Sequence, residues 1–287
     1  MAEYRSMQPG FGWDHEAWRS CRVAGKMVEG VSQSRKQTAE MAARADLSSR
    51  PTRTRSRTPF RRNGGGSPSV LEAIDTITIV SLVFVLGLLI IAYFVSLSAL
   101  PPAATNTIRF IFIWHLFDAL THLTLEGSFL YHSFFSFSTT PSGLKLYGAD
   151  FSSAPMAKIW QEYSKADTRW GVADPVVVAI ELPTVLLEGP GAAYICYLLA
   201  KEKQQVWFWI LVVAVGEIYG GWMTFAPEWL TGSPALDTSN WMYLWLYLFF
   251  FNTLWVFIPG WLCWESYRRI VGGLNTANGQ LADRKRR

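Results

Sequence analysis

The stretch TITIVSLVFVLGLLIIAYFVSLSAL, residues 76–100, contains no charged side chain. An α-helix needs about 20 mostly apolar residues to cross the hydrocarbon core of a bilayer, so this stretch is long enough to span a membrane. Residues 241–264 form a second uncharged run of similar length. Both runs are longer than an ordinary core helix of a soluble protein. The sequence therefore predicts an integral membrane protein.

Three further apolar stretches of spanning length, 110–138, 175–200 and 205–226, contain some polar groups. Backbone polar groups inside a bilayer must be satisfied within the segment, which favours helices. We therefore expect an all-α integral membrane protein, with a five-transmembrane-helix bundle in residues 71–270. Residues 271–287 form a polar, basic C-terminal tail.

The N-terminal part, residues 1–70, differs in composition from the rest. It holds half of the 26 Lys and Arg residues and the low-complexity run SSRPTRTRSRTPFRRNGGGSPS. Such a composition offers little to bury, so we expect a disordered Arg/Ser-rich tail. Nothing in it supplies the aromatic or base-reading groups of a folded nucleic-acid surface, and we expect no nucleic-acid partner.

The link at residues 139–174 is polar and includes KIWQEYSKADTRW, which mixes aromatic and charged residues. This mixture is typical of a helix that lies at the membrane interface. We expect it to cover one mouth of the bundle. The links 201–204 and 227–240 are short, so the last three spans should be antiparallel neighbours.

Ionisable side chains form a stripe along the second span. His115, Asp118, His122 and Glu126 follow one another at spacings of three, four and four, which places them on one face of a helix. Each ionisable group at bilayer depth costs at least about 2.5 kcal/mol on insertion scales, so a set of four indicates a functional site.

Two other spans repeat the pattern, with Glu181, Thr184 and Glu188 in the third and Asn252, Trp255 and Pro259 in the fifth. Three stripes facing one another would form a polar pocket with aromatic walls. For a lone Asn or Thr, a hydrogen bond to a neighbouring helix is an alternative role.

Two kinds of chemistry suit this pocket. HxxDxxxHxxxE offers nitrogen and oxygen ligands for a metal, but no other span contributes the second set of histidines that such sites usually have. Proton transfer uses the same residues as they stand, because a buried carboxyl and a neighbouring His can exchange a proton. We favour proton transfer and expect neither a metal nor another cofactor.

Five separated motifs resemble one known family. LTHLTLEGSF (120–129), WQEYSKADTRW (160–170), AIELPTVLLEGP (179–190), GEIYGGWMTF (216–225) and FNTLWVFIPG (251–260) occur in the order and spacing of the emopamil-binding protein family. These are the sterol 8,7-isomerases that share the EXPERA domain. The resemblance covers residues 75–270, nearly all of the chain outside the tails.

The resemblance implies a multi-pass protein of the endoplasmic reticulum membrane, often a homodimer, whose cavity accepts a sterol and cationic amphiphilic drugs. The activity it implies is transposition of a ring C=C bond from the 8 to the 7 position. The catalytic set it implies is His122, Glu126, Glu181, Asn252 and Trp255. We expect Thr184, Tyr219 and Asp118 to contact the substrate. Asp167 and Arg169 of the interfacial link would be structural or gating residues.

Some positions depart from the family pattern. Glu217 stands where a Gln is usual, Gly221 where an Asp is common, and Pro183 follows two residues after Glu181. These changes leave the acid/base set intact but alter the pocket beside it. Two alternatives to a sterol isomerase therefore stay open: an isomerase of another polycyclic terpenoid, and a non-catalytic protein that binds sterols or amphiphiles.

The implied reaction protonates an alkene to a tertiary carbocation and then removes a proton from the neighbouring carbon, so it needs no redox cofactor. Glu181 and the His122/Glu126 pair would supply donor and acceptor, in either order. Trp255 would stabilise the cation through its ring face. Asn252 would orient one of the acids.

Basic residues divide between the two faces of a five-span protein, so charge alone does not orient it. Arg284 and Lys285 stand as in cytosolic retrieval signals of the endoplasmic reticulum. On that interpretation the C-terminal tail is cytosolic and the N-terminal tail luminal.

Overall fold

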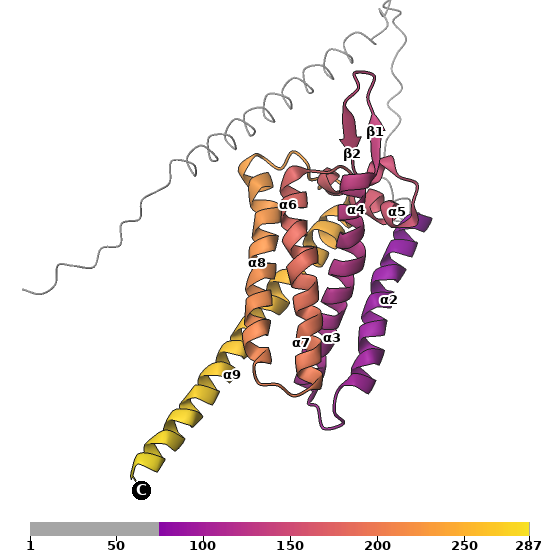
Figure 1. Cartoon of the computed structure of the whole chain (residues 1–287). Coiled ribbons are helices and arrows are strands. Elements are labelled where there is room, and N and C mark those ends of the chain that lie inside the picture. Colours follow the sequence, from indigo (N-terminus) through magenta and orange to yellow (C-terminus); the bar gives the residue numbers. More distant parts are fainter. Residues whose placement is uncertain (1–74, 287) are drawn as a thin grey trace, which may run out of the picture. The chain divides into compact units, whose positions relative to one another are not determined.

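The computed structural model describes residues 75–286, which form long helices and one structured link (Figure 1). Five of these helices are long and apolar enough to cross a membrane, which confirms the predicted all-α five-helix fold. The predicted disordered tail at residues 1–70 lies outside the described residues.

The first span, α2 (Thr76–Ala99), begins at Asp75, whose carboxylate accepts a hydrogen bond from the Thr78 backbone N–H at 2.9 Å. Most of its large apolar side chains are exposed, as a helix facing lipid requires. Its buried face holds mainly small or hydroxylated residues: Thr78, Ser81, Leu88, Ala92 and Ser96. Small residues allow close approach of the helix backbones, and α2 packs on the next span and on part of the link that follows it.

The second span joins α3 (Asn106–Thr121), a π-helical segment η2 (His122–Glu126) and α4 (Gly127–Phe135). It packs against α2 and against the third span. The third span has the same construction, with α6 (Pro175–Pro183), a π-helical η5 (Thr184–Glu188) and α7 (Gly189–Ala200).

The link between these two spans contains the hairpin β1 (Phe137–Thr139) and β2 (Lys145–Tyr147), η3 (Ala149–Phe151), α5 (Pro155–Tyr163) and η4 (Thr168–Trp170). Figure 1 shows it at the end of the bundle where α2 begins and α4 ends. Gly148 has a φ of 142°, and a Cβ there would meet the backbone of Gly171 and Val172. Glycine at this position thus allows the two ends of the link to touch.

The fourth span is α8 (Val206–Leu230), and the fifth joins a π-helical η6 (Tyr243–Phe251) to α9 (Asn252–Arg286). These two spans pack along each other. We expected the bundle to end at residue 270, but α9 continues beyond it, and its residues 272–286 are exposed (Figure 1). The predicted polar tail is therefore helical as far as Arg286.

The centre of the bundle is apolar at the end away from the link. Ile111, Ile195, Ile210 and Leu262, each from a different span, are completely buried. At the link end, polar and aromatic side chains replace this packing, and the bundle encloses a cavity.

Candidate active site

Each of the three polar stripes lies in or beside a π-helical segment. His122 and Glu126 begin and end η2, Thr184 and Glu188 begin and end η5, and Asn252 directly follows η6. π-helical turns are rare and frequently occur at functional sites. The extra residue in each turn shifts the side chains around the helix axis relative to a regular α-helix.

Two prolines flank the π-helical segment of the third span. Pro183 and Pro190 have no N–H, so each removes one α-helical hydrogen bond. The N–H of Gly189, between them, donates instead to the carbonyl of Thr184, five residues earlier. A Cβ on Gly189 would lie 3.1 Å from the Cβ of His122, so this glycine allows the third span to approach the second beside the histidine.

The cavity is bounded by all five spans and by the link. Its apolar lining includes Leu82, Val85, Phe117, Leu125, Ile159, Trp160, Trp170, Ile180, Phe251 and Trp255; its polar lining includes Ser81, Thr121, His122, Glu126, Glu162, Tyr163, Glu181, Thr184, Glu188, Glu217, Thr224, Tyr247 and Asn252. Such a mixture of apolar walls and a few convergent polar groups is typical of a ligand site. The link covers this mouth of the bundle, as the sequence predicted.

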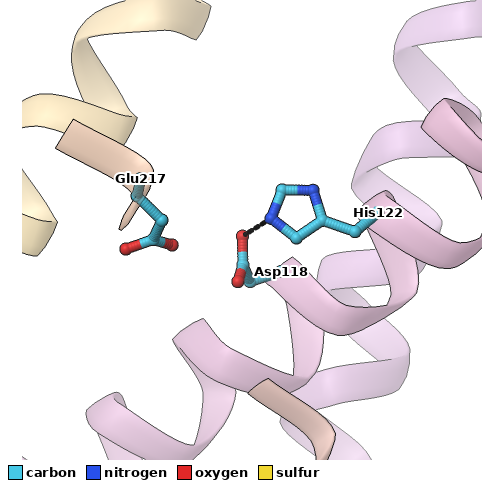
Figure 2. A group of neighbouring side chains, drawn as sticks. All are labelled: Asp118, His122 and Glu217. Atoms are coloured by element: carbon cyan, nitrogen blue, oxygen red, sulfur yellow. Dashed lines mark ion pairs between the residues drawn. The ribbon is translucent and has the colours of Figure 1, made fainter. Parts of the chain in front are cut away.

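His122 lies between two carboxylates of its own span. Its Nε2 is 2.9 Å from Oδ1 of Asp118, and its Nδ1 contacts Oε2 of Glu126. Figure 2 shows the first of these ion pairs, with Glu217 approaching from α8. An imidazole held at both nitrogens by carboxylates has a fixed ring orientation and can exchange a proton with either neighbour.

Three more carboxyl groups enter from other spans. Glu181 and Glu217 are 5% and 4% exposed, and Glu188 is half-buried. Of the described residues that line the cavity, none is Lys or Arg. The carboxyls therefore outnumber the single basic group, His122. Because unpaired charges are costly in a desolvated site, several carboxyls must retain their protons.

Trp255 presents an aromatic surface to the cavity. Its Nε1–H donates to Oδ1 of Asp118 at 2.8 Å, and its ring lies 5.4 Å from that of Trp114 and 6.0 Å from that of Phe117. Trp160 and Trp170 also line the cavity, and their rings stack at 4.8 Å. Aromatic ring faces are non-nucleophilic surfaces that attract positive charge.

Asn252 lies in the cavity wall but does not contact an acid. Its Nδ2 donates to Tyr163 Oη at 3.0 Å and to the carbonyls of Tyr247 and Leu248, which the π-helical segment leaves available. Burial raises the pKa of Tyr163, so this phenol stays protonated. The expectation that Asn252 orients a carboxyl is corrected: it joins the fifth span to α5.

Two predicted substrate contacts also need correction. Tyr219 is 64% exposed and absent from the cavity lining, because Glu217, Gly220 and Thr224 occupy the inner face of α8. Tyr219 follows Glu217 by two residues, which is a rotation of about 200° around the helix axis. Tyr219 therefore points outward. Asp118 is completely buried behind His122 and Trp255 rather than at the cavity surface. Thr184 does line the cavity, and its hydroxyl donates to the Ile180 carbonyl.

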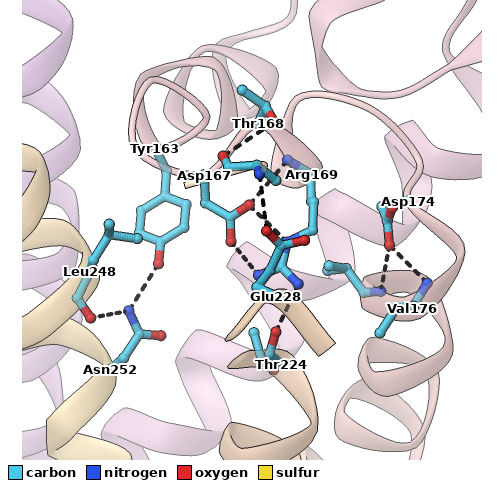
Figure 3. A network of polar contacts seen from close by, with 12 residues as sticks. Tyr163, Asp167, Thr168, Arg169, Asp174, Val176, Thr224, Glu228, Leu248 and Asn252 are labelled. Carbon is cyan, nitrogen blue, oxygen red and sulfur yellow. Dashed lines mark hydrogen bonds and ion pairs between the residues drawn. The ribbon is translucent and has the colours of Figure 1, made fainter. Parts of the chain in front are cut away.

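A second polar network closes the mouth of the cavity (Figure 3). Arg169 makes a bidentate pair with Asp167, at 2.9 and 2.6 Å, and donates to the Thr224 carbonyl of α8 at 2.7 Å. Glu228 lies 3.9 Å from Arg169 and accepts from the backbone N–H of Ala235. Burial alone would lower the pKa of Arg169, but Asp167 and Glu228 raise it overall. This network ties the link to α8.

Glu162 of α5 belongs to a similar paired group. It accepts from Thr78 and Tyr247, both at 2.9 Å, and from Lys165 at 2.5 Å. Burial opposes the charge on Lys165, but Glu162 and Asp75 raise its pKa above the ordinary value. Glu162 was not predicted as a site residue. Its WQEY context shows an interfacial helix but not which face turns inward.

Glu217 is the other residue that sequence reasoning left out of the site. Atoms of Asp118, His122 and Glu217 that are suitable as metal ligands lie within 4.8 Å of one another (Figure 2). The helical phase of Glu217, Gly220, Gly221 and Thr224 was a usable signal, because these residues share one face of α8. Asp118, His122 and Glu217 are also the group that would suit a divalent ion by ligand type.

A family profile for EXPERA (EXPanded EBP superfamily) matches residues 155–266. The probable 3-beta-hydroxysteroid-Delta(8),Delta(7)-isomerase of Arabidopsis thaliana is 30% identical over 60% of this chain and 71% of its own length. The chain belongs to the emopamil-binding protein family, the EXPERA family.

Other EXPERA-family relatives are similar over most of their length. The 3-beta-hydroxysteroid-Delta(8),Delta(7)-isomerase of Cavia porcellus is 26% identical over 76% of this chain and 89% of its own. Isomeliandiol synthase of Melia azedarach is 28% identical over 71% and 87%, respectively. The relatives thus include proteins named for more than one activity.

Proposed function

We propose that this EXPERA-family protein is a membrane isomerase that moves a ring double bond of a sterol from the 8 to the 7 position. The observation that supports this most strongly is the site itself: one imidazole between two carboxylates, in a cavity that buried Glu181 and Trp255 also line. The relatives named as Delta(8),Delta(7)-isomerases add the reaction class.

The proposed reaction begins with proton donation to one carbon of the alkene, which leaves a tertiary cation on the other. Removal of a proton from the neighbouring ring carbon then forms the new double bond, and the proton balance is zero. Glu181 and the His122–Glu126 pair supply the donor and the acceptor from two neighbouring helices. Apolar and aromatic walls exclude water, which would otherwise trap the cation.

Trp255 stabilises the cation without attacking it, because an indole face is electron-rich but poorly nucleophilic here. A desolvated cation over such a face gains about 2 kcal/mol or more. The bond from Nε1 to Asp118 keeps the indole in place. Asn252 and Tyr163 fix the wall beside it.

A second substrate class is supported by one specific feature. A Cβ on Gly221, in the cavity lining, would meet nothing within 4 Å, so the structure leaves space beside α8. A larger or differently substituted polycyclic terpenoid would use that space, and a relative is named isomeliandiol synthase. The reaction type would be unchanged.

Sterol analysis of cells that lack their own 8,7-isomerase tests this function. Expression of the wild type should convert accumulated 8-ene sterols to 7-ene sterols, whereas Glu181→Gln at equal membrane abundance should not. If both proteins bound sterol but neither changed the sterol profile, a non-catalytic binding protein would be the better description. Assay of purified protein with other polycyclic terpenoids then separates the two substrate classes.

We also propose that the cavity binds cationic amphiphilic drugs and that the membrane is that of the endoplasmic reticulum. The excess of carboxyls over basic groups in the lining favours a ligand with a buried amine. Radioligand competition measures the drug affinity, and co-localisation microscopy tests the membrane. The homodimer that the family resemblance implies is tested by crosslinking in native membranes.

A further inference from the structure

Asp118 of α3 and Glu217 of α8 meet beside His122 without a role in the proton transfers described above. Ligand-type atoms of the three residues lie within 4.8 Å of one another (Figure 2). Asp118 is completely buried and Glu217 is 4% exposed. The pair therefore joins two helices at a point that water hardly reaches.

The hydrogen bonds of this pair are incomplete. Oδ1 of Asp118 accepts from Trp255 Nε1 and lies 2.9 Å from His122 Nε2. The contact of His122 Nε2 with Oδ1 is an ion pair by distance. Nε2 of His122, Oδ2 of Asp118 and both carboxyl oxygens of Glu217 have no hydrogen-bond partner among the described residues. Buried polar atoms in native proteins almost always have a partner. A hydrogen on one of the two carboxyls would supply it.

The balance of charge also indicates that one of the two carboxyls is protonated. Two carboxylates at this separation, away from water, cannot both remain ionised. Most groups around them are also acidic: Glu126 from η2, and Glu181 and Glu188 from the third span. The buried imidazole of His115 and the Cys196 thiol of α7 also face Asp118. His122 is the one lining residue of the described chain that can carry positive charge, and it already faces Asp118 and Glu126.

We propose that the Glu217 carboxyl is protonated and donates a hydrogen bond to Oδ2 of Asp118. Glu217 is therefore a positioning residue for His122 and Trp255. Asp118 then stays an acceptor at Oδ1, where both of these side chains converge. His122 keeps its hydrogen on Nε2, so proton exchange takes place at Nδ1, with Glu126. The inference rests on the proposed isomerase function in those experiments that measure turnover.

The arrangement predicts a loss of turnover at high pH. When Glu217 loses its proton, two carboxylates face each other and the hold of Asp118 on His122 and Trp255 weakens. Turnover should therefore fall on the alkaline side, and a neutral donor at position 217 that cannot be deprotonated should prevent this.

Two substitutions at position 217 distinguish the effect of the hydrogen-bond donor from the effect of side-chain shape. Glu217→Gln keeps a neutral donor, so kcat at neutral pH should fall no more than about threefold, and its alkaline decline should move up by about one pH unit or more. Glu217→Leu leaves Asp118 without a donor, and kcat should fall about 10- to 100-fold. Trp222→Phe, on the exposed side of α8, is the matched control.

Infrared difference spectroscopy of the purified full-length protein provides a readout that does not depend on activity. The wild type should show carbonyl stretches of buried protonated carboxylic acids at neutral pH, and Glu217→Gln should lack one component that Glu181→Gln keeps. This result supports the shared proton even if no sterol is isomerised, in which case only the proposed function fails.

Three results would overturn the proposal. One is a Glu217→Gln variant as inactive as Glu217→Leu in folded protein. Another is a Glu217→Gln spectrum with the same protonated-acid components as the wild type. The third is a stoichiometric divalent metal in the wild type that Glu217→Gln releases, since the three residues would then be ligands instead.

Discussion

The cavity and the network that closes its mouth are both rich in buried charge, but they differ in how that charge is balanced. At the mouth, Asp167 has Arg169 as a bidentate partner, and Glu162 has Lys165. In the cavity, the carboxyls of Glu181 and Glu217 have no cationic partner except the shared His122. Paired charges hold elements together, whereas carboxyls in excess of cations keep protons that a reaction can use.

The largest effect should come from the cavity. Glu181→Gln keeps the shape of the side chain but removes its titratable proton, so kcat should fall about 10²- to 10⁴-fold. Because no ion pair is broken, the melting temperature should change little. Turnover assays and thermal unfolding in detergent measure both. The control is Glu202→Gln, an exposed carboxyl in the α7–α8 link. Normal turnover by Glu181→Gln would exclude it as an acid or base.

At the mouth of the cavity, we expect a substitution to reduce stability more than turnover. Arg169→Gln leaves Asp167 buried without its partner, which should reduce the free energy of unfolding by about 3 to 5 kcal/mol. The double variant with Asp167→Asn should be less destabilised than Arg169→Gln alone, because Asp167, the bidentate partner of Arg169, no longer carries an uncompensated charge. Chemical denaturation of both proteins tests this. An Arg169→Gln protein of unchanged stability would remove the distinction between the two regions.

Trp255 tests whether the cavity stabilises positive charge. Trp255→Leu should lower kcat and the affinity for amine drugs together, each by about 10- to 30-fold, because both depend on about 2 kcal/mol from the indole face. Trp222→Leu, at an exposed position, serves as the control. If the variant kept its amine affinity and lost only turnover, the cation would be stabilised elsewhere.

A smaller effect should follow from Gly216→Ala. A Cβ at this position would collide with the carboxyl of Glu188, so this acid must move within the cavity. We expect turnover to fall about tenfold, in line with modest displacement of a catalytic-site group. Gly87→Ala, whose Cβ would meet nothing within 4 Å, is the matched control. Equal activity of both variants would show that the position of Glu188 is unimportant.

The smallest effect should be that of Tyr219→Phe. Its ring is 64% exposed on the outer face of α8 and does not line the cavity. The KM for sterol should remain within about twofold of the wild type, since surface changes usually have small effects. A large increase in KM would restore the sequence-based expectation that Tyr219 contacts the substrate.

The sequence by itself determined the number of spans and most of the residues that face inward. Uncharged runs of membrane-spanning length are specific because lipid cannot satisfy backbone polar groups. The spacing of His122, Glu126, Glu181 and Thr184 was also informative, since ionisable or polar groups at bilayer depth are costly and helix geometry places them on one face. The resemblance added the chemistry, but it also suggested Tyr219, whose helical phase should have excluded it.

Only the tertiary structure decided which residues meet across helices. Hydropathy does not reveal that Glu217 of α8 faces Asp118, or that Asn252 bonds to Tyr163 of α5 instead of an acid. The π-helical segments are a further reason why the sequence alone could not predict these contacts. Each inserts a residue into a turn, and this rotates all later side chains relative to a regular helix, so the 3.6-residue period alone cannot fix their directions. Contacts between spans depend on the packing of the whole bundle, and no local pattern encodes it.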